Sequence, residues 1–127
     1  MSDERYLLDT QILLWMDRRP EKISRRLQAT LDAGFEIYFS AASAWEIAIK
    51  CSLGKFSIAH SLATLAESFG FLELPVSTRY AEIVARLPWH HKDPFDRMIV
   101  AQAIKEQLTL VTADRRLANY NLKILQV

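Results

Sequence analysis

Four acidic residues fall where a carboxylate can take part in chemistry: Asp9, Glu46, Asp96 and Asp114. Asp9 and Asp114 each follow a short apolar run that predicts a buried strand. In a parallel α/β sheet, ligands bind in the crevice beyond the carboxyl ends of the strands. Asp96 begins the helix that leads into the second of these strands. We therefore expect the acids to converge at one edge of a sheet, although Asp9, Asp96 or Asp114 taken alone is better explained as a helix N-cap.

Glu46 is not explained as an N-cap, because it lies inside a predicted helix. At helical spacing it interrupts an apolar stripe made of Ala42, Trp45, Ile49 and Leu53. A buried carboxylate without a partner is costly, so it takes a partner or shifts its pKa. A salt bridge to Lys50, one turn further on, is the structural alternative, but a surface pair of this kind does not account for an inward position.

The stretch His91–Ala103 begins the helix that carries Asp96. Asp93 is predicted to be its N-cap and Pro94 its first residue, where the missing N–H costs nothing. Asp96 then falls in the first turn, above the apolar stripe of Ile99, Val100 and Ala103. We choose Asp96 over Asp93 as the functional acid, and Asp93 keeps the capping role.

Several carboxylates at one strand edge repel each other unless a cation neutralises them. Ligands that are all oxygen suit Mg²⁺ or Mn²⁺ better than zinc. Such a cluster can hold one or two metals that activate water and stabilise the charge on a phosphodiester during in-line displacement. The pattern therefore favours metal-dependent phosphodiester chemistry, in which no serine or cysteine nucleophile is needed.

The elements that must position these acids alternate between strand and helix. Strands are predicted over residues 6–8, 35–39, 71–74, 109–111 and 122–125. Helices are predicted over about 10–17, 21–33, 41–53, 61–69, 77–87 and 94–107, with a turn or short helix over 115–118. This order predicts an α/β fold with a mainly parallel central sheet.

Composition narrows the class of protein. The 127 residues are 50% hydrophobic, which predicts one globular domain over residues 1–127. Sixteen basic residues against fifteen acidic ones give a net charge of +1, so nucleic-acid binding would need a local patch. Cys51 is alone, and the polar start of the chain does not resemble a signal peptide. We expect a cytoplasmic protein with no membrane segment.

Four segments together resemble the PIN-domain nucleases, and in particular the VapC-type toxins of bacterial toxin–antitoxin systems. Leu7–Thr10 resembles the family's opening strand and first acid, and Ser43–Lys50 its second acidic motif. His91–Arg97 is similar to the third motif, and Val111–Asp114 to the fourth, in which the threonine hydroxyl supports the site. Each segment alone is weakly specific, whereas the four in this order are strongly specific.

The resemblance implies a three-layer α/β/α fold with a small, mainly parallel sheet. It implies a Mg²⁺-dependent endoribonuclease, with Mn²⁺ as a possible substitute, whose catalytic residues are Asp9, Glu46, Asp96 and Asp114. Asp9 and Asp96 would be the most direct metal ligands. It also implies an RNA substrate, a cognate antitoxin and a homodimer.

Other residues have two explanations each. His90 and His91 are better explained by loop or capping roles than as metal ligands. Arg97, Arg115 and Arg116 are candidates for contacts with RNA phosphates, but solvation or pairing with the acids explains them nearly as well.

The tryptophans and a basic cluster also remain open. Trp15 and Trp45 are predicted to pack in the core, whereas Trp89 could equally stack on a base. The basic residues between Arg18 and Arg26 are better explained as a solvated helix face than as a binding surface.

Two other functional classes are weighed against the nuclease. A phosphoacceptor signalling domain also gathers acids around Mg²⁺, but it would need its acceptor aspartate after a middle strand and a lysine after the last one. Here Pro75 follows the third strand and Lys123 enters the last one. An RNA- or protein-binding module without turnover is the second alternative, and the complete set of acids argues against it.

Overall fold

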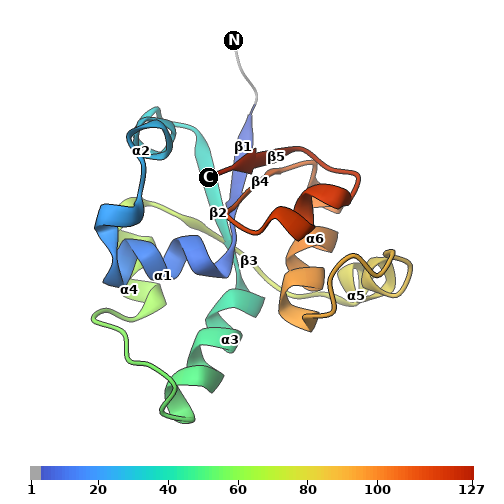
Figure 1. Cartoon of the computed structure of the whole chain (residues 1–127), viewed down its shortest axis with the longest axis horizontal. Helices are drawn as coiled ribbons and strands as arrows, with labels where there is room; N and C mark the ends of the chain where they lie inside the picture. Colours follow the sequence, from blue (N-terminus) through green and yellow to red (C-terminus); the bar gives the residue numbers. More distant parts are fainter. Residues whose placement is uncertain (1–3) are drawn as a thin grey trace.

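The computed structural model describes residues 4–127; residues 1–3, part of the polar start that we predict not to be a signal peptide, lie outside the described residues. Five parallel strands form one sheet in the order β3-β2-β1-β4-β5 (Figure 1). The strands are β1 Arg5–Leu8, β2 Glu36–Ser40, β3 Leu72–Leu74, β4 Thr109–Thr112 and β5 Ile124–Gln126. The predicted α/β class with a parallel sheet is confirmed.

The helices lie between the strands in sequence. They are α1 Thr10–Arg18, α2 Arg25–Asp32, α3 Ala41–Ser52, α4 Leu62–Phe69, α5 Thr78–Val84 and α6 Pro94–Glu106. Two 3₁₀ turns, η1 Pro20–Lys22 and η2 Arg115–Asn119, complete the set. Within residues 4–127, none of these helices is long and apolar enough to span a bilayer.

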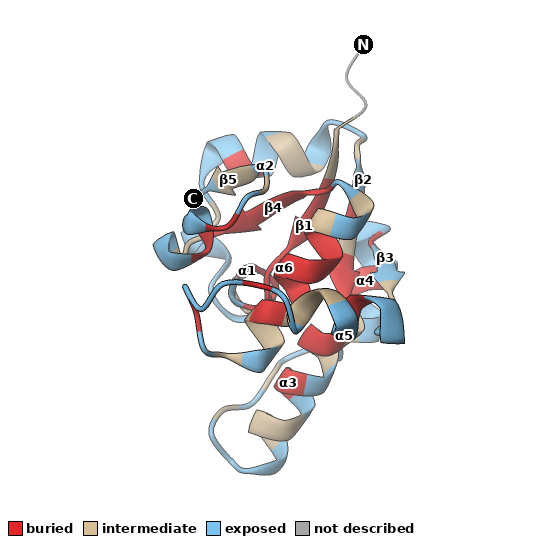
Figure 2. Ribbon diagram, turned by 90° about the vertical axis from the view of Figure 1, so that its right-hand side faces the viewer, coloured by how far each residue is buried: buried red, intermediate tan, exposed pale blue. Residues whose placement is uncertain are grey.

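The helices cover both faces of the sheet, so the chain forms the three layers that the resemblance implies. On one face, α1, α2 and α4 pack over a core that includes Leu8, Phe39 and Val111. On the other, α5, α6 and η2 enclose a core that includes Leu7 and Leu110. Buried residues are continuous through β1, β4 and α6, whereas much of α3 extends beyond the sheet (Figure 2). Adjacent residues of β1 thus face opposite cores, as strand geometry requires.

The chain adds β2 and β3 on one side of β1, and then β4 and β5 on its other side. The position between β1 and β4, where the order of addition changes side, is the one at which ligands bind in open α/β sheets. Leu8 pairs with Phe39 of β2 and with Val111 of β4. The next residue, Asp9, donates its backbone N–H to the Val111 carbonyl at 3.1 Å. The ends of β1 and β4 are thereby aligned, and the side chains that follow them meet at one edge.

Two helices differ from their predicted extents. The predicted helix over residues 21–33 is divided into η1 and α2, because Ser24 is the N-cap of α2 and its hydroxyl accepts the Leu27 N–H at 3.1 Å. A serine favours this break by offering the backbone a local hydrogen bond. Helix α5 ends at Val84, where residues 77–87 were predicted.

Candidate active site

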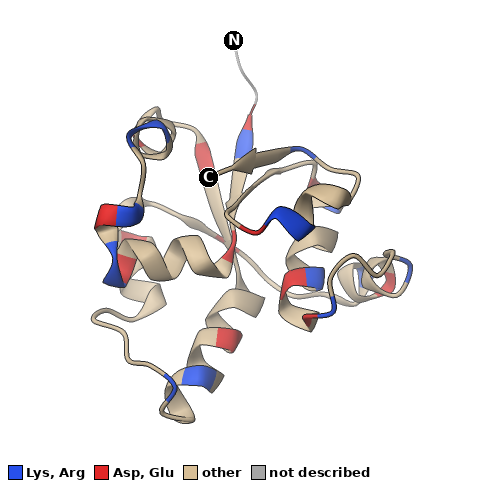
Figure 3. Cartoon of the chain, viewed as in Figure 1, with Lys and Arg blue, Asp and Glu red and all other residues tan. Residues whose placement is uncertain are grey.

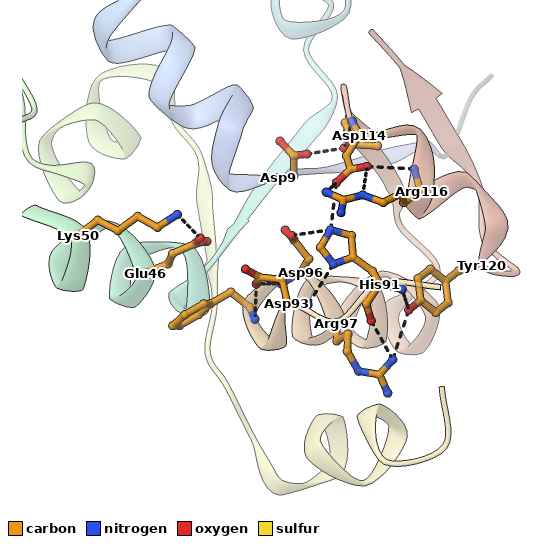
Figure 4. Close-up of polar contacts among 12 residues, drawn as sticks. Asp9, Glu46, Lys50, His91, Asp93, Asp96, Arg97, Asp114, Arg116 and Tyr120 are labelled. Atoms are coloured by element: carbon orange, nitrogen blue, oxygen red, sulfur yellow. Dashed lines mark hydrogen bonds and ion pairs between the residues drawn. The ribbon is translucent and has the colours of Figure 1, made fainter. Parts of the chain in front are cut away.

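A cleft of about 380 Å³ opens at the carboxyl ends of β1 and β4. Its lining includes all four acids predicted from the sequence, namely Asp9, Glu46, Asp96 and Asp114. They come from four different elements: Asp9 follows β1, Glu46 is on α3, Asp96 is on α6 and Asp114 follows β4 (Figure 4). The structure therefore brings together acids that are more than 100 residues apart in the chain.

Asp9 is held by both of its carboxylate oxygens and is almost fully buried. As the N-cap of α1, its Oδ1 accepts the Ile12 N–H at 3.0 Å. Its Oδ2 accepts a short hydrogen bond from the Thr112 hydroxyl. Burial raises the pKa of Asp9 to about 6, against the lowering effect of the Thr112 hydrogen bond. The N-cap explanation and the functional one therefore apply to the same carboxylate.

Thr112 connects the first and fourth acids. Besides donating to Asp9, its hydroxyl oxygen accepts the backbone N–H of Asp114 at 3.0 Å. Asp114 in turn pairs with Arg116, whose guanidinium lies 2.9 Å from Oδ2. These hydrogen bonds from Arg116 lower the pKa of Asp114 to about 2, so this carboxylate is ionised.

Glu46 and Ala42 are buried on α3, as predicted, but the predicted stripe is wrong at Trp45 and Leu53. Trp45 and Leu53 are 64% and 65% exposed, so the buried face is turned towards Ser43 and Ile47. The Ser43 hydroxyl lies 2.8 Å from the Thr10 hydroxyl, which ties α3 to α1 one turn before Glu46.

The two oxygens of Glu46 have different surroundings. Oε2 accepts a hydrogen bond from Lys50 at 2.9 Å, so the alternative salt bridge does form. Oε1 is buried and has no hydrogen-bond partner among residues 4–127. A buried acceptor left unpaired is costly and indicates a site that takes a further group.

Asp93 has the capping role predicted for it, and both Asp93 and Asp96 line the cleft. Asp93 is the N-cap of α6, and its Oδ1 accepts the N–H groups of Phe95 and Asp96. Asp96 is left free to face the cleft. Burial, reinforced by the charges of the neighbouring acids, raises the pKa of Asp96 to about 7. Such a carboxylate is neutral or ionised depending on what shares the cleft.

His91 lies in the loop before α6, as predicted, and it also lines the cleft. Its Nδ1 accepts the Asp93 N–H at 3.0 Å, which leaves the ring proton on Nε2. Nε2 lies 3.0 Å from Asp114 Oδ2 and 3.2 Å from Asp96 Oδ2. One ligand atom from each of these three residues lies within 4.8 Å of the others, but with its proton on Nε2 the imidazole donates to the two carboxylates and does not ligate a metal in this arrangement. In the sequence, the position of His91 two residues before Asp93 is the only signal that its ring lies near the acids.

Arg97 was a candidate for a phosphate contact, and that assignment is wrong. The side chain is buried and points away from the cleft (Figure 4). The Trp89 ring lies 3.8 Å from its guanidinium carbon. The guanidinium donates to the Tyr120 hydroxyl and to four backbone carbonyls, those of Val84, Leu87, Pro88 and His91. Arg97 therefore fastens the loop that carries His91.

The remaining candidates divide between core and surface. Trp15 packs partly against the core, as predicted, whereas Trp45 is exposed and meets the Phe95 ring edge-on at 5.3 Å. His90 is exposed and contacts the Tyr120 ring. Arg116 lines the cleft, so a phosphate contact remains open to it.

The donor set of the cleft fits a hard divalent cation. The carboxylates of Asp9, Glu46, Asp96 and Asp114 offer oxygen ligands. A cation would satisfy the unpaired Glu46 Oε1, and it would offset the repulsion between acids that, after burial, helps to raise the pKa of Asp96. Asp9 and Asp96 both line the cleft, and neither carboxylate is neutralised by a lysine or arginine among the described residues.

Comparison with known proteins identifies the family and supports the fold. Residues 6–123 match the PIN domain family. A curated relative, Ribonuclease VapC22 of Mycobacterium tuberculosis, is 28% identical over 121 residues, 90% of each chain. Among solved structures, VapBC2 from Rickettsia felis bound to a promoter DNA fragment has a TM-score of 0.73 at 17% identity, covering 96% of this chain and 98% of that one. A toxin–antitoxin complex from Klebsiella pneumoniae has a TM-score of 0.66 at 20% identity, covering 95% and 96%. The match spans both cores and the strand ends that carry the acids, and the chain belongs to the PIN domain family.

Proposed function

We propose that this protein is a Mg²⁺-dependent endoribonuclease that hydrolyses RNA phosphodiester bonds and acts as the toxin of a toxin–antitoxin pair. The observation that carries the proposal is the convergence of four carboxylates at one strand edge, with a buried oxygen of Glu46 left unpaired. Membership of the PIN domain family and the similarity to a protein named as a ribonuclease support it.

In this proposal, Asp9 and Asp96 hold Mg²⁺, and Mn²⁺ can replace it. A bound Mg²⁺ would lower the pKa of a water molecule and offset the charge that develops on the phosphodiester. Asp9 is suited to this role because Ile12 and Thr112 fix its orientation from both sides. Asp96 is suited to it because it faces the cleft without any capping duty.

The other residues of the cleft orient these groups and the substrate. The free oxygen of Glu46 can accept a hydrogen bond from a water molecule in the cleft. Lys50 and Arg116, at the rim, supply positive charge for a phosphate. His91 holds Asp96 and Asp114 side by side through Nε2.

The proposed partners rest on the comparisons. The Klebsiella pneumoniae neighbour is described as a toxin–antitoxin complex, and we infer a cognate antitoxin for this chain from the shared fold. A homodimer is the assembly that the family resemblance implies.

The test is incubation of purified, partner-free protein with total RNA in EDTA, then in Mg²⁺ or Mn²⁺. Asp96→Asn is the inactivating variant, and Asp32→Asn is its matched control, because Asp32 is exposed on α2 and does not line the cleft. We expect discrete fragments that require metal, persist in Asp32→Asn and vanish in Asp96→Asn, while circular dichroism shows all three proteins folded.

Two results would contradict the proposal. Cleavage retained by Asp96→Asn would remove that residue from the site. Metal-dependent RNA binding by folded wild-type protein, with no fragments from any RNA, would favour a binding module over an enzyme.

A further inference from the structure

A second groove, of about 210 Å³, leads away from the acid cleft along α1. Gln11 and Leu14 line both the cleft and this groove, so the two are continuous. The remaining lining consists of Trp15, Arg18, Arg19 and Lys22. We call these six residues the α1 groove.

The α1 groove follows one face of a helix. Gln11, Leu14, Trp15 and Arg18 are spaced at i, i+3, i+4 and i+7, which places them on a single stripe. From Gln11 to Arg18 the helix rises roughly 10 Å at about 1.5 Å per residue. Figure 3 shows α1 leading from the acidic sheet edge to a group that includes several basic residues at its far end. The groove thus runs from the acids towards positive charge.

Two of the cations in the groove are available to a ligand. Arg18 and Lys22 are exposed, and neither forms an ion pair within residues 4–127. Each lies over an aromatic ring instead: the Arg18 guanidinium is 5.0 Å from the centre of Phe56, and the Lys22 ammonium 5.4 Å from that of Trp15. Cation–π contacts orient these groups without neutralising them.

Two acids near the groove are already engaged. The Asp17 carboxylate accepts the N–H groups of Ala59 and His60 on the other side of α1. Glu21 pairs with Arg19 at 2.9 Å. The unneutralised charge of the groove is therefore positive.

We propose that the α1 groove binds the backbone phosphates of single-stranded RNA next to the bond placed in the acid cleft. Basic side chains interleaved with an aromatic ring along a groove are what single-stranded nucleic acid binds. The acids repel phosphate, so flanking contacts are needed to hold the strand over them. This inference rests on the proposed function and extends it to the substrate path.

The test compares the double variant Arg18→Ala/Lys22→Ala with Arg25→Ala/Arg26→Ala. The control pair lies on α2, is equally exposed and removes the same charge, but does not line the groove. Binding of a fluorescein-labelled, mixed-sequence single-stranded RNA of about 12 nucleotides is measured by anisotropy in the Asp96→Asn background. A labelled dinucleotide, too short to reach the groove, is measured alongside.

We expect the groove pair to weaken binding of the longer RNA about tenfold and to lower the dependence of log K on log salt by about 1.4, the value for two phosphate contacts. Dinucleotide binding and the control pair should be unaffected. In the active protein, KM for the longer RNA should rise while kcat changes less than about twofold.

Equal losses for the two pairs would indicate a general charge effect and overturn the proposal, as would no loss in either. A loss confined to binding of an antitoxin peptide would assign the groove to a protein partner and also overturn it. If the wild type cuts no RNA but the groove pair still loses RNA binding, the groove stands and the nuclease assignment falls.

Discussion

His91 and Asp114 are joined by a 3.0 Å contact between Nε2 and Oδ2, although 23 residues separate them in the chain. Because Nδ1 accepts the Asp93 N–H, the ring directs its proton at Asp114 and, at 3.2 Å, at Asp96. The imidazole therefore sits between two carboxylates that would otherwise repel each other. His91 therefore positions the acids, although it is not one of the four residues selected from the sequence.

Replacing His91 by alanine should weaken divalent metal binding about 10- to 100-fold, the usual cost of losing a residue that orients metal ligands. Titration calorimetry with Mn²⁺ measures this directly. His90→Ala is the matched control, because His90 is the exposed neighbour that contacts only the Tyr120 ring among the interactions described. Equal metal affinity in the two variants would remove His91 from the site.

The stability of the metal-free protein should fall as pH rises from about 4 to about 7. The ordinary pKa of Asp96 is 3.8 and burial raises it to about 7, so in this range the folded protein binds more protons than the unfolded chain. Asp96→Asn lacks this titration, so above pH 7 its free energy of unfolding should exceed that of the wild type by on the order of 1–3 kcal/mol. Urea denaturation at pH 5 and pH 8 measures the difference.

The same experiment in Mg²⁺ provides its control. Metal should raise wild-type stability at pH 8 and leave Asp96→Asn nearly unchanged, because a ligand stabilises only the state that binds it. A wild type whose stability rises from pH 5 to pH 8 without metal would contradict the expected sign. Asp114, whose pKa lies near 2, loses its contribution only at pH values below about 4.

Replacing Arg97 by methionine should destabilise the protein by about 3–5 kcal/mol. The change leaves five oxygen acceptors, four of them backbone carbonyls, without their donor. Arg97→Lys keeps the charge but has fewer donors in a different geometry, so it should recover only part of the loss. Denaturant unfolding of both variants is compared with that of Arg115→Met, which removes the same charge from an exposed position. If Arg97→Met lowered the free energy of unfolding as little as Arg115→Met does, the proposed structural role of Arg97 would be wrong.

Thr112→Val should lower RNA cleavage about 10- to 100-fold while the fold is retained. Valine has nearly the same shape but cannot donate to Asp9 or accept from Asp114. Thr112→Ser restores the hydroxyl and should recover most of the activity. Single-turnover cleavage rates compare the three proteins, and full activity in the valine variant would show that the hydroxyl does not act on the site.

The convergence of Asp9 and Asp114 was predictable because it depends on the ends of two strands, which local apolar runs mark well. Which face of α3 is buried was not predictable. The apolar stripe assigned Trp45 to the core, but much of α3 extends beyond the sheet, where Trp45 remains exposed beside the Phe95 ring. The contacts of His91 and Arg97 could not be predicted for another reason. Their partners are distant carboxylates and backbone carbonyls, and every residue has a carbonyl, so no pattern of side chains marks them.

Helices α1 and α6 begin in different ways, and this decides how each can tolerate damage. At α1 a single carboxylate, Asp9, both starts the helix and faces the cleft, so replacing it by alanine, which cannot cap, removes a cleft carboxylate and a helix cap together. At α6 the capping hydrogen bonds are accepted by Asp93, and Asp96, which lines the cleft beside it, takes no part in the cap. Loss of a cleft carboxylate and loss of a cap are therefore coupled in Asp9→Ala and separate in Asp96→Ala. We expect Asp96→Ala to keep the start of its helix, whereas Asp9→Ala weakens the start of α1.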